Sequence, residues 1–143
     1  MNKKNTEYLY KTYPKLFIQH KLPPKKTCMC WDICCGDGWF NILDETCKKL
    51  ELLKKQNKKA KIKLEFFQIK EKFGELRIYY NLDISNNDYK INVTFAIDKI
   101  IEEAIQKSPS ICELCGSLAT KTTKPYIRHL CKKCYEKQRK ESK

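Results

Sequence analysis

The chain has 143 residues, 41% of them hydrophobic, which is enough for one domain that buries a core without disulfide staples. Thirty lysine and arginine residues outnumber 17 acidic ones, and the net charge of +13 favours a polyanionic partner such as a nucleotide or nucleic acid. Genome bias is an equally good explanation of the charge, because all but three of the basic residues are lysine.

The sequence indicates neither a membrane protein nor a secreted one. No apolar run approaches the roughly 20 residues that cross a bilayer, and residues 1–15 lack the apolar core of a signal peptide. We therefore expect a cytoplasmic protein without membrane contact. Its nine cysteines should be thiols or metal ligands, because disulfides are rare in a reducing cytosol.

The N-terminal half predicts two helices separated by a stiff connector. Residues 6–18 favour a short helix or turn interrupted by Pro14, and the two prolines in residues 21–27 favour extended backbone. A longer helix should follow, because apolar side chains then recur at helical spacing. They are Trp39, Leu43, Cys47, Leu50 and Leu53.

A β-hairpin is indicated by the stretch KLEFFQIKEKFGELRIYYNL, whose glycine belongs to the loop. A four-residue loop over 71–74 would pair Ile69 with Leu76. It would also pair Phe67 with Ile78, so that these apolar side chains share the core face. The opposite face would then carry Phe66, Gln68, Lys70, Glu75, Arg77 and Tyr79.

The first strand of this hairpin contains a conflict of parity. Leu64 and Phe66 would point to one face, whereas Phe67 and Ile69 would point to the other. Either a β-bulge lies near Phe66–Phe67, or both faces of the hairpin are partly covered.

Residues 89–107 carry two overlapping patterns. The first few alternate as in a strand, but a longer helical pattern runs through the whole stretch, so we favour a helix. The predicted fold is therefore α+β: two main helices and a β-hairpin, with a short N-terminal helix and a C-terminal zinc knuckle. Residues 1–107 would form the α+β core domain, and residues 108–143 the four-cysteine knuckle packed on it, with a charged tail.

Two CxxC pairs in the C-terminal segment predict a structural zinc site. The ligands would be Cys112, Cys115, Cys131 and Cys134. Each pair places two sulfurs on one side of a tight turn. Four thiolates complete the tetrahedral shell of one Zn²⁺, which leaves no open position for catalysis. Gly116 suits a turn with positive φ, and His129 is interpreted as a bystander.

The remaining cysteines are more consistent with packing thiols than with a second zinc site. They are Cys28, Cys30, Cys34, Cys35 and Cys47. A site built from Cys30, Cys35 and Cys47 with one further group stays open as an alternative. No cysteine–histidine or paired-carboxylate signature supports catalysis, so we expect a protein that is not an enzyme.

The stretch CGDGW predicts the start of a helix rather than a phosphate loop, because a Walker loop needs Gly-Lys-Ser/Thr after it. Asp37 would cap the helix that begins near Gly38–Trp39. Trp31 and Trp39 would fill the adjacent core. The N–H groups at this helix start, from Gly36 to Trp39, could also border an anion.

Four motifs together resemble those of a small protein family found in bacteriophages and prophages: YPKLF, TCMCW…CGDGW, KEKFGELRIYY and CELCG…IRHLC. The resemblance runs from about Tyr13 to Cys134, with the blocks in the same order. The matching positions are Cys30, Trp31, Gly36, Asp37, Gly38, Trp39, Lys70, Lys72, Phe73, Gly74 and Arg77. The family pattern has a single cysteine before GDGW, so the Cys34–Cys35 doublet departs from it.

The family has no assigned activity, and the resemblance implies expression inside an infected bacterium. Small phage accessory proteins often blunt host defences, sometimes by sequestering nucleotide signals. The outer hairpin face, with Lys70, Arg77 and Tyr79, independently favours a protein that binds an anionic ligand of nucleotide type. The expected ligand-binding residues are Trp39, Lys70, Lys72, Arg77, Tyr79 and Arg128.

In that site, arginine and lysine would hold phosphates, and the aromatic rings would stack on a base. Two alternatives stay open: a nucleic-acid-binding zinc ribbon, and a protein-interaction inhibitor of a host factor. The oligomeric state is not indicated, and a homo-oligomer is compatible with the sequence.

Overall fold

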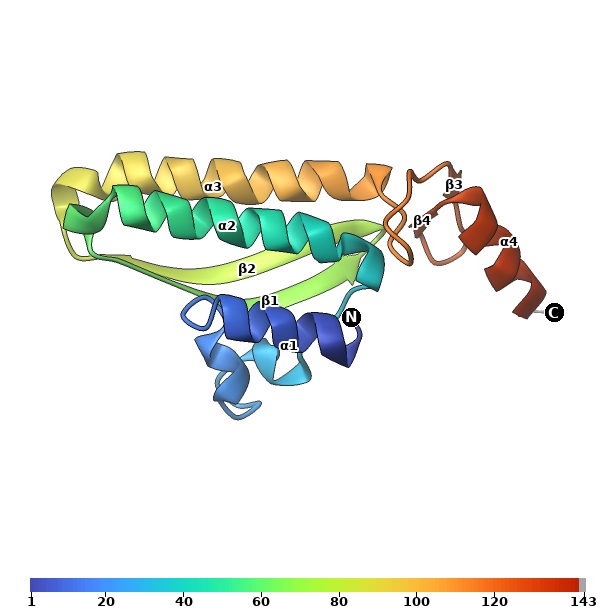
Figure 1. Cartoon of the computed structure of the whole chain (residues 1–143), viewed down its shortest axis with the longest axis horizontal. Coiled ribbons are helices and arrows are strands. Elements are labelled where there is room, and N and C mark those ends of the chain that lie inside the picture. Colours follow the sequence, from blue (N-terminus) through green and yellow to red (C-terminus); the bar gives the residue numbers. More distant parts are fainter. Residues whose placement is uncertain (142–143) are drawn as a thin grey trace.

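The computed structural model describes residues 1–141 and is organised around a long antiparallel β-hairpin (Figure 1). Helices α2 (Phe40–Gln56) and α3 (Lys90–Lys107) lie side by side over one face of strands β1 (Ile62–Lys72) and β2 (Glu75–Ile84). Residues 13–35 lie on the side of β1 away from these helices. This arrangement confirms the predicted α+β fold class.

The two main helices follow the apolar pattern of the sequence. α2 begins after a short 3₁₀ turn, and Leu43, Cys47 and Leu50 are fully buried on its inner side. α3 buries Val93 and Ile97 in the same way. Since α3 covers residues 90–107, the helix predicted over residues 89–107 is confirmed.

Helix α1 (Lys3–Thr12) ends before the proline that predicted its interruption. Its N-terminus is capped by Asn2, whose side chain accepts a hydrogen bond of 2.8 Å from the N–H of Asn5. The ring of Tyr8 contacts that of Phe40 edge-on, with centroids 5.4 Å apart. This contact fixes α1 against the first turn of α2.

The hairpin turn differs from the predicted one. It has two residues, Phe73 and Gly74, whose φ angles of 56° and 80° are typical of the type I′ turn that matches the twist of paired strands. Ile69 therefore pairs with Ile78. The predicted four-residue loop and its pairing of Ile69 with Leu76 are wrong, because both turn residues adopt a positive φ and two residues suffice.

A β-bulge at Phe67 is confirmed, since the strand partners shift at this position. The bulge lets Phe66 and Ile69 face the helices together, and both are fully buried. Phe67 turns to the other face, where its ring lies 5.9 Å from that of Tyr79. The predicted placement of Phe66 on the outer face and the pairing of Phe67 with Ile78 are therefore wrong.

The outer edge of β1 is paired rather than open. The N–H of Phe66 donates to the carbonyl of Leu16 at 2.7 Å, and Cys34 bridges to the strand beside Lys70 through two backbone hydrogen bonds. Natural sheets cover such edges because an unpaired strand recruits further strands. The connection between α1 and α2 therefore seals the sheet on this side.

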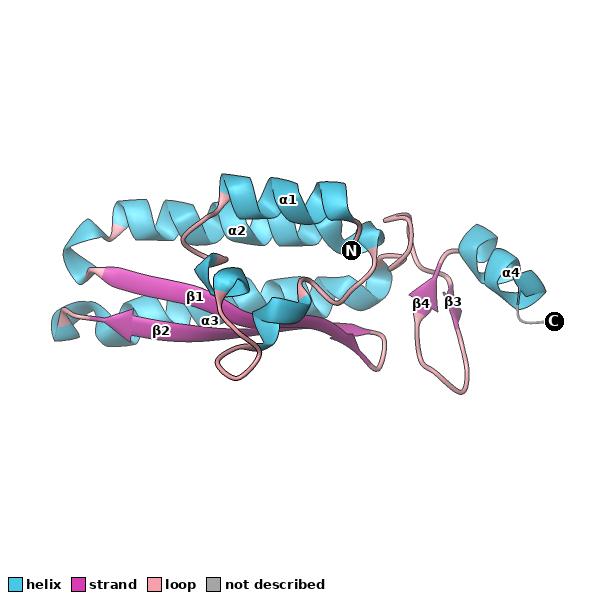
Figure 2. Ribbon diagram, turned by 90° about the horizontal axis from the view of Figure 1, so that it is seen from below, coloured by secondary structure: helices cyan, strands magenta, loops and turns pink. Residues whose placement is uncertain are grey.

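The C-terminal segment lies at the end of the hairpin that carries its turn (Figures 1 and 2). It holds two short paired strands, β3 (Lys121–Thr122) and β4 (His129–Leu130), followed by helix α4 (Lys132–Glu141). Within residues 1–141, no helix combines the length and apolar character that crossing a membrane requires.

Candidate metal centre and the basic cavity beside it

The four cysteines of the two CxxC pairs come together in the C-terminal segment. The Sγ atoms of Cys112, Cys115, Cys131 and Cys134 all lie within 4.8 Å of one another. The distance between the sulfurs of Cys115 and Cys131 is 3.6 Å. A tetrahedral ion with bonds of about 2.3 Å to sulfur has sulfur–sulfur edges of about 3.8 Å. The cluster can therefore hold one metal ion.

The surroundings of these thiols shift their pKa values in opposite directions. Hydrogen bonds from Ser117 lower the pKa of the Cys115 thiol to about 6, whereas burial raises the pKa of Cys134 to about 12. The N–H of Cys134 points at the sulfur of Cys131 over 3.4 Å. A metal bound by four thiolates would displace the protons that the cluster holds without it.

The first CxxC pair docks on the GDGW stretch through Glu113. The N–H of Gly38 donates to the Glu113 carbonyl at 2.8 Å, and the N–H of Gly36 donates to its carboxylate at 3.1 Å. The indole N–H of Trp39 donates to the carbonyl of Ile111 at 3.1 Å. All three donors face residues 111–134, which carry the four cysteines and which we call the metal-binding segment. We call residues 36–39 the docking platform.

The carboxylate of Glu113 is also paired with arginine. Only 4% of Glu113 is exposed, and its second oxygen accepts a hydrogen bond of 2.7 Å from Nε of Arg128. Removing either partner of a buried ion pair leaves an uncompensated charge. Glu113 therefore joins three parts of the molecule: the docking platform, the metal-binding turn and the β3–β4 connection.

The glycines explain how closely these parts approach. A Cβ on Gly36 would lie 2.2 Å from the Glu113 carbonyl oxygen, and one on Gly38 would lie 1.9 Å from the carbonyl oxygen of Cys112. Gly116 adopts a φ of 79°, as the turn chemistry predicted, and its own Cβ would lie 3.1 Å from the Gly38 carbonyl oxygen.

A Cβ on Gly74 would lie 2.7 Å from the ring of His129, so the hairpin turn also meets the metal-binding segment. The chain has four glycines, and all of them lie at this junction. Local sequence rules did not reveal this role, because the close approach joins residues that are remote in the sequence.

Asp37 does not cap α2 as predicted. Burial raises its pKa, but its carboxylate accepts hydrogen bonds from the backbone N–H of Asn2 and the side chain of Asn5, and these lower the pKa below its ordinary value. No side chain caps the start of α2. The predicted anion site at this helix start is also wrong, because Glu113 already accepts from Gly36 and Gly38.

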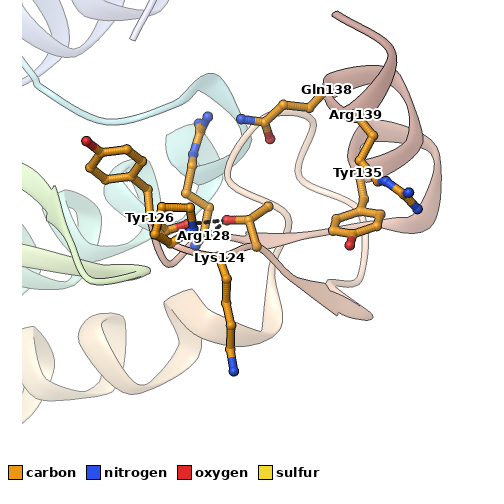
Figure 3. A pocket seen from close by; sticks show the side chains of 8 residues that line it. Lys124, Tyr126, Arg128, Tyr135, Gln138 and Arg139 are labelled. Atoms are coloured by element: carbon orange, nitrogen blue, oxygen red, sulfur yellow. Dashed lines mark hydrogen bonds between the residues drawn. The ribbon is translucent and has the colours of Figure 1, made fainter. Parts of the chain in front are cut away.

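A basic cavity of about 500 Å³ lies beside the metal centre, between the β3–β4 connection and α4 (Figure 3). Three of its lining residues are cations, two are tyrosines and none is acidic. The lining residues are Thr123, Lys124, Pro125, Tyr126, Arg128, Tyr135, Gln138 and Arg139. The guanidinium of Arg139 lies 6.0 Å from the ring centre of Tyr135, which is cation–π range.

Four of the predicted ligand-binding residues share the outer face of the hairpin near its turn. Lys70 pairs across the strands with Arg77, and its ammonium lies 5.7 Å from the ring centre of Tyr79. Lys72 follows on the same face, 5.5 Å from the ring centre of Phe73. Arg77 also forms an ion pair of 2.7 Å with the neighbouring Glu75.

The other two predicted residues lie elsewhere. Trp39 is fully buried in the core, so its ring cannot stack on a ligand, and its place in the predicted site is wrong. Arg128 lines the basic cavity and not the outer face of the hairpin. The prediction that Trp31 fills the core is also wrong, because this side chain is 69% exposed.

The remaining cysteines form no second metal site in the part of the chain that the structure describes. Burial raises the pKa of Cys35 to about 12 and that of Cys47 well above its ordinary value, as expected for packing thiols, whereas Cys34 is exposed and does not fit that prediction. His129 is not part of the metal cluster, since its Nδ1 hydrogen-bonds the hydroxyl of Thr122 at 3.1 Å.

Comparison with known proteins adds no assignment. No protein-family model matches the chain, and no curated protein or solved structure shows significant similarity to it. The function has to be inferred from the metal centre, the cavity and the surfaces around them.

Proposed function

We propose that this protein is a non-enzymatic, zinc-stabilised binding protein for an anionic ligand of nucleotide type, and that the ligand occupies the basic cavity. The observation that carries the proposal is the lining of this cavity, which combines Lys124, Arg128 and Arg139 with two tyrosines and no carboxylate. Its volume of about 500 Å³ is in the range of small-molecule sites.

The chemistry of the lining suits a nucleotide. Guanidinium groups match phosphate oxygens in a fork geometry, and a tyrosine ring offers a face on which a base can stack. Arg128 is held through Nε by the buried Glu113, so its terminal nitrogens are oriented before a ligand arrives. Arg139 lies beside the ring of Tyr135 and would contribute the second guanidinium.

Zinc is the metal that the ligand set favours. Four thiolates in a tetrahedral arrangement are typical of structural zinc, and a closed shell leaves no position for substrate. The role of the ion would be to hold the β3–β4 connection and α4 in place, since Cys131 and Cys134 flank the start of that helix. The expected result of native mass spectrometry is one zinc per chain.

The resemblance to a phage and prophage family extends the proposal to a biological role. A protein with such a cavity, made inside an infected bacterium, would sequester a nucleotide signal of the host defence. The proposal requires binding alone and no chemical step.

Calorimetric titration of the full zinc-loaded chain with nucleoside mono- and triphosphates and with inorganic phosphate tests the cavity. Arg139→Ala should weaken nucleotide binding by about 10- to 100-fold, since a hydrogen bond to a charged group contributes about 1.5–3 kcal/mol. Lys11→Ala, which removes one exposed charge from α1, is the matched control and should bind as the parent does.

Arg139 is chosen over Arg128 because the loss of Arg128 would strand the buried Glu113 carboxylate and confuse binding with folding. Absence of nucleotide binding in the parent protein would overturn the proposal, as would an affinity that Arg139→Ala leaves unchanged.

A further inference from the structure

We infer that the ligand is a single-stranded nucleic acid, of which one nucleotide occupies the basic cavity while the next ones lie on the outer face of the hairpin. This inference rests on the proposed function of the cavity and extends it to a longer ligand. Its starting point is the contact between the hairpin turn and the metal-binding segment, which joins two basic and aromatic surfaces into one.

The turn and the cavity are neighbours. A Cβ on Gly74 would lie 2.7 Å from the ring of His129 and 3.1 Å from Cγ2 of Ile127. These two residues flank Arg128, which lines the cavity together with Tyr126. Figure 2 shows the same proximity, with the hairpin turn beside the β3–β4 connection. A ligand that leaves the cavity on this side therefore meets the hairpin turn first.

The surface beyond the cavity alternates cations with aromatic rings. From the turn along the strands it carries Phe73, Lys72, the cross-strand pair of Lys70 with Arg77, and Tyr79. One carboxylate lies on this face of the two strands near the turn, that of Glu75, and the guanidinium of Arg77 neutralises it. Proteins that hold single strands use this combination, since cations follow the phosphates and rings stack on successive bases.

Phe73 is the residue that local structure does not explain. It occupies the first position of the turn at a φ of 56°, where asparagine, aspartate or glycine is preferred and a bulky side chain is strained. Its ring is 68% exposed, so burial in the core does not account for it either. A base stacked on this ring would give the phenylalanine a function at a position that otherwise disfavours it.

A single strand suits this surface better than a duplex or a free nucleotide. Rings can stack only on bases that are not already stacked within a helix, and single strands present such bases. A free nucleotide would fill the cavity and leave Phe73 and the paired cations of the hairpin without a partner. Tyr126, which is 84% exposed and lines the cavity, offers one more ring close to Ile127, the residue that meets the hairpin turn.

Fluorescence anisotropy on the full zinc-loaded chain tests the inference with thymidine monophosphate, an oligothymidylate of about 12 nucleotides and the corresponding duplex. The oligonucleotide should bind more tightly than the mononucleotide and the duplex. Phe73→Asn, which suits the positive φ and preserves the turn, should weaken oligonucleotide binding about tenfold while mononucleotide affinity stays unchanged. Phe95→Asn is the matched control, because Phe95 is 70% exposed on α3, and it should change neither affinity.

Salt dependence gives an independent measurement. Each phosphate contact to a single strand contributes about 0.7 to the slope of log affinity against log salt, so K70A/R77A should reduce the slope by about 1.4. Equal affinities for oligonucleotide and mononucleotide, or an unchanged affinity of Phe73→Asn, would overturn the inference while leaving the cavity proposal intact. The cavity proposal is tested separately, by the effect of Arg139→Ala on mononucleotide affinity.

Discussion

Replacing Gly38 by alanine should release the metal-binding segment from the core. The added methyl group would lie 1.9 Å from the carbonyl oxygen of Cys112 and 2.5 Å from the backbone nitrogen of Gly116. Both atoms belong to the backbone of the metal-binding turn, so no side-chain rotation relieves the overlap. The segment therefore has to move away from the docking platform.

The cost follows from the contacts that this movement breaks. Gly36 and Gly38 donate to Glu113, and Trp39 donates to Ile111. Two of these are hydrogen bonds to carbonyl oxygens, at about 1 kcal/mol each, and the third reaches a carboxylate, at about 2 kcal/mol. The free energy of unfolding should therefore fall by about 4 kcal/mol, which corresponds to about 12 °C in Tm for a domain of this size.

Guanidinium denaturation and calorimetry in excess zinc measure this loss, and native mass spectrometry counts the metal. Gly38→Ala should keep one metal per chain, because all four ligands come from residues 112–134. Asn41→Ala, at an exposed position early in α2, should stay within about 0.5 kcal/mol of the parent. A Gly38→Ala protein with parental stability would refute the docking of this segment on the platform.

Two further predictions concern the metal and the pH dependence of stability. Removing the metal with a chelator should undock the C-terminal segment and speed amide hydrogen exchange at Gly36 and Gly38, while α2, α3 and the hairpin keep their circular dichroism; unchanged exchange would contradict this. The lowered pKa of Asp37 adds stability above the unfolded value of about 3.9, and this is lost as pH falls through the folded pKa. Asp37→Asn should therefore reduce stability to urea at pH 7 and converge with the parent in acid, and an equal gap at both pH values would count against it.

Local spacing is sufficient to predict the main helices and the cluster of four cysteines. A helical period places Leu43 and Cys47 on one face of α2, which the fold buries, and each of the two CxxC turns brings two sulfurs together. The hairpin register was wrong because it depended on one backbone angle. Phenylalanine at position 73 gives no sign of a positive φ, so a two-residue turn was not anticipated.

The role of the docking platform is hidden in the sequence for a different physical reason. Gly36 and Gly38 look like flexible turn residues at a helix start, and Asp37 looks like its cap. These positions require glycine because the backbone carbonyls of Glu113 and Cys112 leave no room for a Cβ atom. Both residues lie more than 70 positions further along the chain. A glycine required by a remote backbone is indistinguishable, within one sequence, from a glycine required by its own turn.

The order of the docking platform and its partner along the chain has a consequence for biosynthesis. Residues 36–39 leave the ribosome well before residues 112–134, and at about 5–20 residues per second the interval lasts for several seconds. During this interval the N–H groups of Gly36, Gly38 and Trp39 lack the acceptors that Glu113 and Ile111 later provide. A metal ion taken up by the four cysteines would then complete the fold only after these last residues have emerged. Starvation for that metal would therefore delay the maturation of newly made chains and expose them to proteases for longer.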